Sequence, residues 1–362
     1  MAAGYIEYDG RFTFGFYPGL LVYEHSTQCW ERVGPADWSL PFEERGIQRS
    51  EVRSQRSEIG NRRSEAGNQR SKAGALEPLL TSDLRPLTSL PFAPTISRDD
   101  FCRMVQRAKA YISAGDIYQV NLSQRFTAGW KSDIWQFYER LRHYSAAPHA
   151  SYVDLGGKVL LSSSPELFLR MSGSRILTRP IKGTRPRFAD PLADEQSAFE
   201  LITSPKEIAE LVMITDLERN DLGRNCEFGS VTVTELLKLE KFAQVFHLVS
   251  TIEGGLRTGV DHVTALQGCF PGGSITGAPK KRAMEIIHEL EPVPRGIYTG
   301  AIGYFGFNGE SQFSIAIRTV AIENDQAQFH VGAGIVADSD PELEYEETLH
   351  KAAGILIAAS QM

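Results

Sequence analysis

The sequence predicts an α/β protein of the α+β type, in which helices pack outside mostly antiparallel sheets. Two observations carry this prediction. Segments with strand character outnumber segments with helical character, and several of them alternate apolar and polar residues with a period of two. Such strands are typical of antiparallel sheets that turn one face toward a core.

The first 42 residues are rich in aromatic and turn-forming residues, as in RFTFGFYPGLLVYEH, and predict a few short strands. Residues 43–78 differ in composition, and from Gln48 they repeat a seven-residue unit four times: QRSEVRS, QRSEIGN, RRSEAGN and QRSKAGA. A coiled coil needs two apolar positions in each unit, whereas only one position is apolar here and glycines weaken any helix. We therefore interpret 43–78 as a flexible, basic insertion without a catalytic role.

Residues 79–362 are predicted to form one catalytic domain. Ser97 can cap a helix whose apolar residues from Phe101 to Ile112 share one face, and Gly115 ends it. The segments KVLLSSS, ELFLRM and RILTRPI follow as short strands, and a second helix begins at Ser204 with proline at its first position. A third helix follows GAP, the late strands are YTGAIGYFGF, QFSIAIRTVAI and QAQFHVGAGIV, and the last helix starts near Pro341.

The composition excludes several classes of function. A net charge of -7 leaves no dominant basic surface, which argues against nucleic acid as a partner. No stretch of 18 or more apolar residues occurs, and the N-terminus lacks a signal-peptide pattern, so we expect no membrane partner and a cytoplasmic location. The four cysteines are far apart without CxxC spacing, so neither a zinc site nor a disulfide framework is indicated.

Two predicted helices each carry a pair of glutamates three residues apart. Glu207 and Glu210 share one helical face, and Glu344 and Glu347 repeat the spacing near the C-terminus, with Lys351 one turn further on. One such pair is usually a solvated face. Two pairs that converge could hold Mg²⁺, which prefers a few carboxylates together with water and oxygens of an anionic substrate.

Three further features suggest anion binding. Gly332 and Gly334 follow a strand and allow backbone N–H groups to approach an anion, although a turn without a ligand is equally consistent. The segment PGGSITGAPKKR, which contains Ser274, places glycines before a helix N-terminus, where a negative group is favoured. Arg318 falls inside the apolar segment FSIAIRTVAI and needs a structural or a bound carboxylate as its partner.

Taken together, SPELFL, PIKGTRPR, DLERNDLGR, PGGSITGAPKKRAMEII, YTGAIGYFGF, IRTV and GAGIVADSDPELEYEETLHKA resemble the chorismate-utilising enzymes. That family includes anthranilate, aminodeoxychorismate, isochorismate and salicylate synthases. The resemblance covers about residues 97–360 in the family's order. It implies the chorismate-binding fold, in which two large antiparallel sheets enclose a Mg²⁺-dependent chorismate site with helices outside.

The resemblance also implies the roles of individual residues. Glu210 and Glu347 would bind Mg²⁺ directly, with Glu207 and Glu344 acting through water or behind them, and the metal would hold the ring carboxylate. Tyr298 and Arg318 match the pair that grips the enolpyruvyl carboxylate, while Gly332, Gly334 and Lys351 would surround the other carboxylate. Thr184 and Ser274 also fall at substrate-binding positions.

The same resemblance assigns the acid and its neighbour. Glu166 matches the general acid toward the departing C4 hydroxyl and needs a raised pKa, through burial or nearby negative charge, to stay protonated. His247 matches a family histidine near that hydroxyl, although a lone histidine in an apolar segment is otherwise more often a satisfied core residue.

Two positions divide the family by reaction. Water-adding members carry a lysine base where this chain has Gln119, which cannot act as that base and so disfavours isochorismate and salicylate chemistry. Anthranilate synthases usually carry alanine where this chain has Lys182, and aminodeoxychorismate synthases carry lysine. An amine there can attack C2 with loss of the C4 hydroxyl and leave a covalent adduct that ammonia resolves at C4.

The resemblance therefore favours amination of chorismate to 4-amino-4-deoxychorismate, on the route to p-aminobenzoate and folate. The chain lacks a glutamine-hydrolysing signature, so a separate glutamine amidotransferase subunit is expected to supply ammonia. The alternatives are anthranilate synthase component I and, in another class, a catalytically inactive partner-binding subunit.

Overall fold

The computed structural model describes residues 1–16, 20–24, 29–33, 52–53, 91–360 and 362. The predicted repeat insertion at 43–78 lies outside the described residues, apart from the two-residue strand β5 (Val52–Arg53). Two antiparallel sheets with helices packed against them dominate the described residues, which confirms the predicted fold class.

The larger sheet has nine strands in the order β12-β14-β11-β10-β17-β16-β1-β2, and β13 also pairs with β14. All its strand pairs are antiparallel. Its strands are β1 (Ala2–Ile6), β2 (Phe12–Phe16), β10 (Leu167–Ser172), β11 (Arg175–Arg179), β12 (Ile181–Pro186), β13 (Thr232–Lys241), β14 (Val245–Gly255), β16 (Ala301–Phe305) and β17 (Glu310–Ile315).

The second sheet has seven antiparallel strands in the order β15-β7-β19-β18-β9-β8, with β6 added beside β7. Its strands are β6 (Ala93–Pro94), β7 (Gln119–Gly129), β8 (His149–Asp154), β9 (Lys158–Ser164), β15 (Gly277–Ala278), β18 (Thr319–Glu323) and β19 (Gln326–Ile335). A small third sheet joins β3 (Leu20–Glu24), β4 (Cys29–Val33) and β5.

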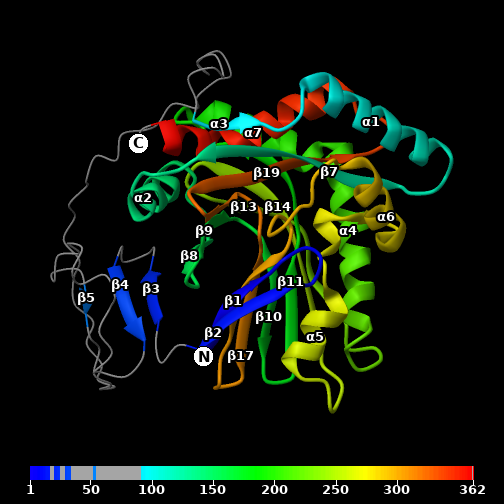
Figure 1. The fold of residues 1–362 in the computed structure, drawn as a ribbon. Coiled ribbons are helices and arrows are strands. Elements are labelled where there is room, and N and C mark those ends of the chain that lie inside the picture. Colours follow the sequence, from blue (N-terminus) through cyan, green and yellow to red (C-terminus); the bar gives the residue numbers. More distant parts are fainter. Residues whose placement is uncertain (17–19, 25–28, 34–51, 54–90, 361) are drawn as a thin grey trace.

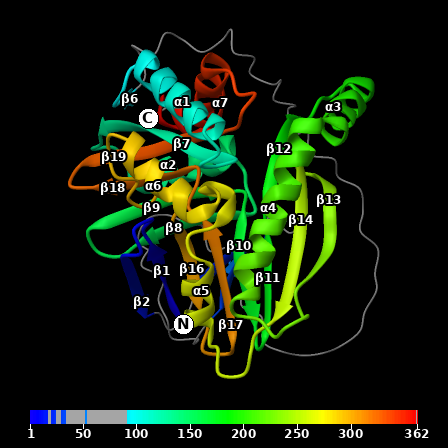
Figure 2. The ribbon, with the colours of Figure 1, turned by 90° about the vertical axis from the view of Figure 1, so that its right-hand side faces the viewer.

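The helices cover the outer faces of the two main sheets. Helices α1, α6 and α7 lie against β7 and β19, whereas α4 runs along β12, β13 and β14 (Figures 1 and 2). Their bounds are α1 (Arg98–Ser113), α2 (Ile134–Tyr144), α3 (Pro191–Thr203), α4 (Pro205–Gly223), α5 (His262–Cys269), α6 (Lys280–Leu290) and α7 (Pro341–Ser360).

Local sequence explains where three of these helices begin. Ser97 caps α1 in a capping box with Asp100, and Ser204 caps α4, whose first residue is a proline. Helix α7 also begins with a proline, Pro341. The predicted starts of all three helices are confirmed.

The apolar core consists of several clusters, most of them between the helices and the sheets and one between the two sheets. One apolar cluster joins α2 and α7 to the seven-stranded sheet, and others fill the space under α1 and α6 and under α4 and α5. A smaller cluster contains Ile302 and Tyr5 of the larger sheet together with Leu160 and Ala321 of the smaller one. This cluster packs the two sheets together beside the residues that the sequence assigned to a site.

The predicted strand around Arg318 is wrong. Strand β17 ends at Ile315 and β18 begins at Thr319, and the two strands belong to different sheets. Arg318 lies in the crossing between them with φ of 48°, a left-handed conformation that an L-residue adopts only at a cost. Tyr298 likewise precedes its predicted strand, because β16 begins at Ala301.

Candidate active site

The four glutamates predicted from helical spacing do come together. Lys206, in the first turn of α4, feels the negative charges of Glu344, Glu210, Glu347 and Glu207. Its ammonium lies 3.5 Å from the carboxylate of Glu344, so it bridges α4 and α7. The converging faces of two helices that are distant in sequence therefore form one acidic cluster.

The glutamates of this cluster differ in the direction in which their pKa values are shifted. Burial, followed by the charge of Glu210, raises the pKa of Glu207, and burial also raises that of Glu344. Burial opposes the charged form of Glu347 as well, but the ammonium of Lys351 at 2.7 Å outweighs it and lowers the pKa. One buried oxygen of Glu344 has no hydrogen-bond partner.

An all-oxygen donor set with an unsatisfied carboxylate oxygen fits a hard divalent cation. In the described part of the chain, no three His, Cys, Asp or Glu side chains are close enough to form a metal site as they stand. The glutamates are instead paired with lysine and arginine side chains, including Glu207 with Arg185 at 3.8 Å. Binding a cation would require these pairs to open.

Lys182, on β12, lies beside the acidic cluster. Its ammonium is 3.6 Å from Oε2 of Glu210, and the amide of Gln119 donates to the same oxygen over 3.4 Å. Gly334 closes the third side, because a Cβ there would lie 2.5 Å from the Gln119 amide and 3.5 Å from the Lys182 ammonium. Lys182 and Gln119, the two residues on which the predicted reaction depends, thus contact the same carboxylate.

Glu166 precedes β10 and is buried. Burial raises its pKa to about 7, while the influence of the Ser274 hydroxyl and the positive charge of Lys182 lower it by less. The raised pKa is in the direction that a general acid at this position requires. Glu166 and the Lys182 ammonium therefore interact electrostatically within the same region of the protein.

Tyr298 and Lys351 meet at Gly332. Lys351 donates to the Gly332 carbonyl over 2.9 Å, and a Cβ on Gly332 would lie 2.7 Å from the Tyr298 hydroxyl. The Tyr298 ring stacks on His330, with centroids 5.2 Å apart. The glycine is therefore needed to admit a buried phenol beside the β19 backbone.

His247 and Thr184 lie opposite each other on neighbouring strands β14 and β12. The Thr184 hydroxyl and His247 Nδ1 are 3.0 Å apart. Burial, followed by the charge of Arg318, lowers the pKa of His247 to about 4, so the imidazole is neutral near pH 7. Burial alone lowers the pKa of Arg318, and no carboxylate of the described residues lies within ion-pair distance of it, so its guanidinium is available to a bound anion.

The contacts of the site join Gln119, Lys182 and Glu210 in one group and Tyr298, Gly332, Lys351 and Glu347 in another, while Thr184 pairs with His247. Sequence reasoning missed two residues beside these groups. Lys206 lies next to Glu207 and could have been found as the cation flanking the first acidic pair. Asn121 lies two residues after Gln119 on the same face of β7, and its buried amide nitrogen, beside Gly332, has no hydrogen-bond partner.

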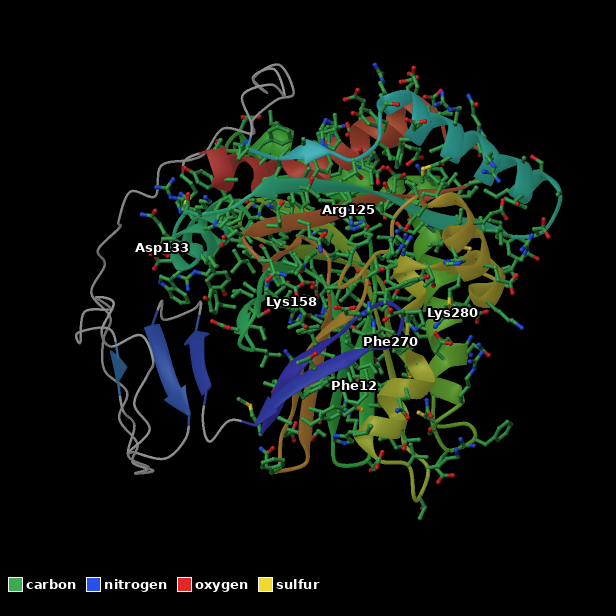
Figure 3. All side chains as sticks on the ribbon, viewed as in Figure 1. Phe12, Arg125, Asp133, Lys158, Phe270 and Lys280 are labelled. Atoms are coloured by element: carbon green, nitrogen blue, oxygen red, sulfur yellow. The ribbon has the colours of Figure 1, made fainter. Side chains whose placement is uncertain are left out.

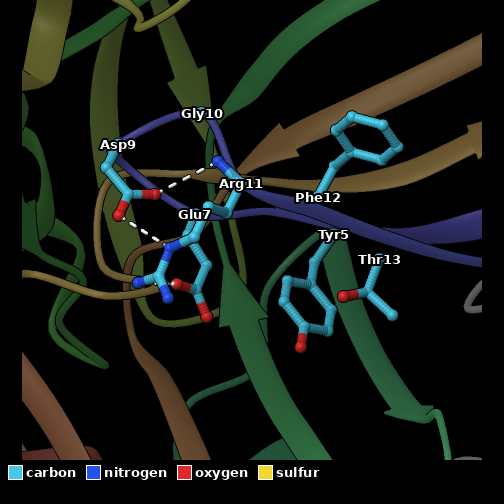
Figure 4. Close-up of a pocket in the computed structure, with 7 residues that line it drawn as sticks. All are labelled: Tyr5, Glu7, Asp9, Gly10, Arg11, Phe12 and Thr13. Carbon is cyan, nitrogen blue, oxygen red and sulfur yellow. Dashed lines mark hydrogen bonds and ion pairs between the residues drawn. The ribbon is translucent and has the colours of Figure 1, made fainter.

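A separate hollow of about 610 Å³ lies over the hairpin of β1 and β2 (Figure 4). Arg11 pairs there with Asp9 and Glu7, and Glu7 also pairs with Lys158. Because these opposite charges compensate one another and no predicted site residue lines the hollow, we place the candidate active site at the junction of the sheets instead.

The sequence profile of the chorismate binding enzymes matches residues 6–357. The chain belongs to this family. Within the family it is 46% identical over 276 residues to aminodeoxychorismate synthase component 1 of Bacillus subtilis (strain 168), covering 76% of this chain and 59% of that protein. It is also 46% identical over 294 residues to anthranilate synthase component 1 of Synechocystis sp., covering 78% of this chain and 58% of that protein.

Solved structures of the chorismate binding family show the same fold. Anthranilate synthase component I from Streptococcus pneumoniae TIGR4 superposes with a TM-score of 0.75 and 31% identity, over 98% of this chain and 80% of that one. An isochorismate synthase from Bacillus anthracis gives a TM-score of 0.66 and 26% identity, over 74% and 73% of the two chains.

The chain spans less than two thirds of the length of the curated relatives that it matches, from 52% to 62%. Relatives that make different products are equally similar to it, so overall identity does not separate the reactions. Among the described helices, none combines the length and the apolarity needed to cross a membrane.

Proposed function

We propose that this protein aminates chorismate with ammonia to give 4-amino-4-deoxychorismate, with Mg²⁺ as the metal. The observation that carries the proposal is the position of the Lys182 ammonium, 3.6 Å from Glu210 and against Gly334. An amine at this point lies beside the acidic cluster and interacts electrostatically with the buried Glu166. The relatives named aminodeoxychorismate synthase component 1 support the same choice.

The geometry supports a substrate held at both of its carboxylates. Arg318, without a carboxylate partner, and Tyr298 would bind one of them, and the backbone at Gly332 and Gly334 with Lys351 would bind the other. Glu210, Glu347 and their neighbours would hold the metal, which supplies a positive charge that binds the ring carboxylate and eases departure of the hydroxyl.

Each proposed step balances in atoms and charge. The uncharged amine of Lys182 attacks C2, the two ring double bonds shift, and the C4–O bond breaks. Glu166 gives its proton to the departing oxygen, which leaves as water. The adduct nitrogen then carries the positive charge that balances the Glu166 carboxylate. Ammonia attacks C4, the double bonds shift back and the C2–N bond breaks, which releases the uncharged lysine amine, and the new ammonium at C4 returns a proton to Glu166. The net reaction is chorismate plus ammonia giving 4-amino-4-deoxychorismate plus water.

Product analysis tests this proposal against its rivals. The purified protein is incubated with chorismate, ammonium and Mg²⁺, and the products are identified by chromatography and mass spectrometry. We expect 4-amino-4-deoxychorismate. Direct formation of anthranilate without an added lyase contradicts the proposal and favours anthranilate synthase, and no consumption of chorismate favours a catalytically inactive subunit.

Substitution of Lys182 tests the covalent step. Lys182→Ala should lower amination by at least about 100-fold, because the nucleophile is lost. The unaltered protein is quenched after exposure to chorismate without ammonia. Its intact mass should show an adduct, and mass analysis of a proteolytic digest should locate the adduct on the peptide that contains Lys182. Lys238→Ala, at an exposed lysine on β13, is the control and should change neither result. Undiminished amination by Lys182→Ala excludes an obligatory adduct.

We also propose that a glutamine amidotransferase subunit supplies the ammonia. The support is the name "component 1" carried by the relatives, which implies a second component for those proteins. Glutamine-dependent turnover should then appear only when such a subunit is added, while ammonium-dependent turnover needs the present chain alone.

A further inference from the structure

A buried arginine, Arg295, joins several segments of the chain at the candidate site. Its side chain is 1% exposed, and its charge is balanced by Glu291, whose side chain is 4% exposed. The guanidinium binds this carboxylate twice, through Nε at 2.9 Å and Nη2 at 2.8 Å. Because the cost of burying two charges largely cancels their attraction, such a pair contributes little to stability by itself.

The ion pair binds the backbone of the site. Nη2 of Arg295 donates to the carbonyl of Asn121 on β7 at 2.6 Å, and Nη1 donates to the carbonyl of Ile275 at 3.1 Å. Glu291 adds a second link to β7, because its Oε1 accepts the backbone N–H of Ser123 at 2.8 Å. The pair therefore fixes one stretch of β7 against the segment that precedes β15.

Arg295 also holds a strained residue next to Tyr298. Thr299 has φ of 59°, a left-handed conformation that is unfavourable for a β-branched residue. Nη1 of Arg295 donates to the Thr299 hydroxyl at 3.1 Å, and that hydroxyl donates to the carbonyl of Tyr298 at 2.6 Å. Strain of this kind persists only where the surrounding structure imposes it. Arg295 therefore helps to impose the backbone conformation directly after Tyr298.

The Tyr298 side chain contacts Arg295 as well. The guanidinium carbon lies 5.5 Å from the centroid of the Tyr298 ring, and the His330 imidazole stacks on that ring at 5.2 Å with an interplanar angle of 12°. The backbone N–H of Tyr298 donates to the Arg295 carbonyl at 3.1 Å. The phenol hydroxyl lies beside β19, where a Cβ on Gly332 would be 2.7 Å from it. Arg295 thus contacts Tyr298 through both its ring and its backbone.

We propose that Arg295 is a positioning residue for Tyr298: it fixes the strained Thr299 backbone and holds the Tyr298 hydroxyl where a substrate carboxylate binds. Glu291 is its counter-ion. This inference rests on the proposed function, in which Tyr298 binds one carboxylate of chorismate. If Arg295 only joined the surrounding segments, its replacement would weaken the fold without acting on the substrate through Tyr298.

Crystal structures of the unaltered protein and of Arg295→Lys test the positioning directly. Lysine keeps a positive charge beside Glu291 but lacks the planar fork that binds Thr299 and the two carbonyls. We expect Thr299 to leave the left-handed region and the Tyr298 ring to separate from His330. Unchanged conformations of Thr299 and Tyr298 in the variant overturn the inference. This comparison needs neither substrate nor metal, so it remains decisive even if the proposed reaction is wrong.

A double-mutant cycle on chorismate kinetics tests the consequence for the substrate. Tyr298→Phe should raise the KM for chorismate by about 10-fold with little change in kcat, because a hydrogen bond to a carboxylate is lost. Arg295→Lys should raise the KM by a similar factor, since the hydroxyl is displaced. The double variant should show about the same 10-fold rise, because moving the ring has no effect once the hydroxyl is absent.

Lys158, which Figure 3 labels, provides a matched control. It lies at the start of β9, pairs with the buried carboxylate of Glu7 at 2.8 Å and lies 5.6 Å from the ring centroid of Tyr5. This cation thus has the same kinds of neighbour as Arg295, but its tyrosine has no predicted role. Lys158→Met should lower the unfolding temperature and leave the KM for chorismate unchanged.

A rise in KM of about 100-fold in the double variant means that Arg295 and Tyr298 act independently, and overturns the inference. If Arg295→Lys does not fold, Thr299→Val takes its place in both experiments. Valine keeps the branched shape and removes the hydroxyl that links Arg295 to the Tyr298 carbonyl. If the unaltered protein consumes no chorismate, the proposed function fails, and the crystal structures alone decide whether Arg295 positions Tyr298.

Discussion

Gly334 shows how closely the side chains are packed around Lys182. The Gln119 amide and the Lys182 ammonium both occupy the space that a side chain at position 334 would need. A single added methyl group would therefore displace at least one of them. Displacement of a catalytic group by about 1 Å can lower a rate by 100-fold. The proposed role of Lys182 therefore requires that position 334 carry no side chain.

We predict that Gly334→Ala lowers chorismate turnover by about 10-fold or more without large loss of thermal stability. The methyl group would meet the end of the flexible Gln119 side chain, which can move, but only by leaving Glu210. Gly129→Ala is the matched control, because position 129 lies on the paired strand β7 and its nearest neighbour would be 4.0 Å away. Equal turnover in the two variants would show that the close approach at Gly334 has no functional role.

At the scale of elements, α4 and α7 each contribute two glutamates to one cluster, and Lys206 partly neutralises them. Like charges held together by two packed helices repel each other, and a bound divalent cation relieves this repulsion. Since a ligand that binds only the folded protein stabilises it, metal binding to this cluster has a thermodynamic signature that does not depend on activity.

Mg²⁺ should therefore raise the unfolding temperature of the protein, and a chelator should reverse the rise. Glu210→Gln with Glu347→Gln should abolish the effect of Mg²⁺, as measured by differential scanning calorimetry. Glu342→Gln is the control on the same helix, because that exposed side chain pairs with Arg98 outside the cluster. An equal Mg²⁺ effect in the double variant and the control would argue that the metal binds elsewhere.

Sequence patterns predicted those elements whose ends carry a specific local signal. Ser97 and Ser204 have side chains that accept helix N–H groups, and these starts were confirmed. The same reasoning did not identify α3, which exposes Leu192 and Phe199 and so lacks a clean apolar face. It also overlooked the pairing of β13 with β14.

The candidate site was predicted from motif positions that matched the family, and the structure brings Gln119, Lys182 and Glu210 into contact, although the roles of these residues stay predictions. Contacts that depend on tertiary packing were not predictable. The sequence indicates only that Glu218 is a polar residue in a helix, and does not predict that it is buried against the turn at Gly273. The sequence predicts one strand through Arg318, because its neighbours are apolar on both sides. No local pattern indicates that the chain passes from one sheet to the other here.

At the scale of the whole molecule, buried titratable groups set how stability changes with pH. Burial lowers the pKa of His149 and His247 to about 4 and that of His330 to about 3. These neutral imidazoles contribute stability that is complete above about pH 6.5 and is lost as pH falls toward 4. Burial raises the pKa of Glu166 and Glu218 to about 7, and their contribution is lost as pH rises from about 4.5 to 7.

The two opposing trends predict that the free energy of unfolding is greatest at about pH 6.5. Three histidines outweigh two carboxyl groups below that pH, whereas the carboxyl groups dominate above it. Urea unfolding midpoints measured from about pH 4 to 9 test this prediction. Glu166→Gln combined with Glu218→Gln should remove the decline on the alkaline side of the maximum and steepen the loss on the acid side. An alkaline decline that persists in this double variant assigns it to other groups.

The backbone of the crossing between the two sheets limits which residues fit at position 318 without strain. The left-handed backbone at Arg318 is one that glycine or asparagine adopts more readily than arginine. A lineage that retained this backbone but no longer needed the guanidinium would gain stability of about 1 kcal/mol by drifting to glycine. Arginine at this strained position is what the proposed anion-binding role predicts, because glycine would relieve the strain but could not supply a guanidinium.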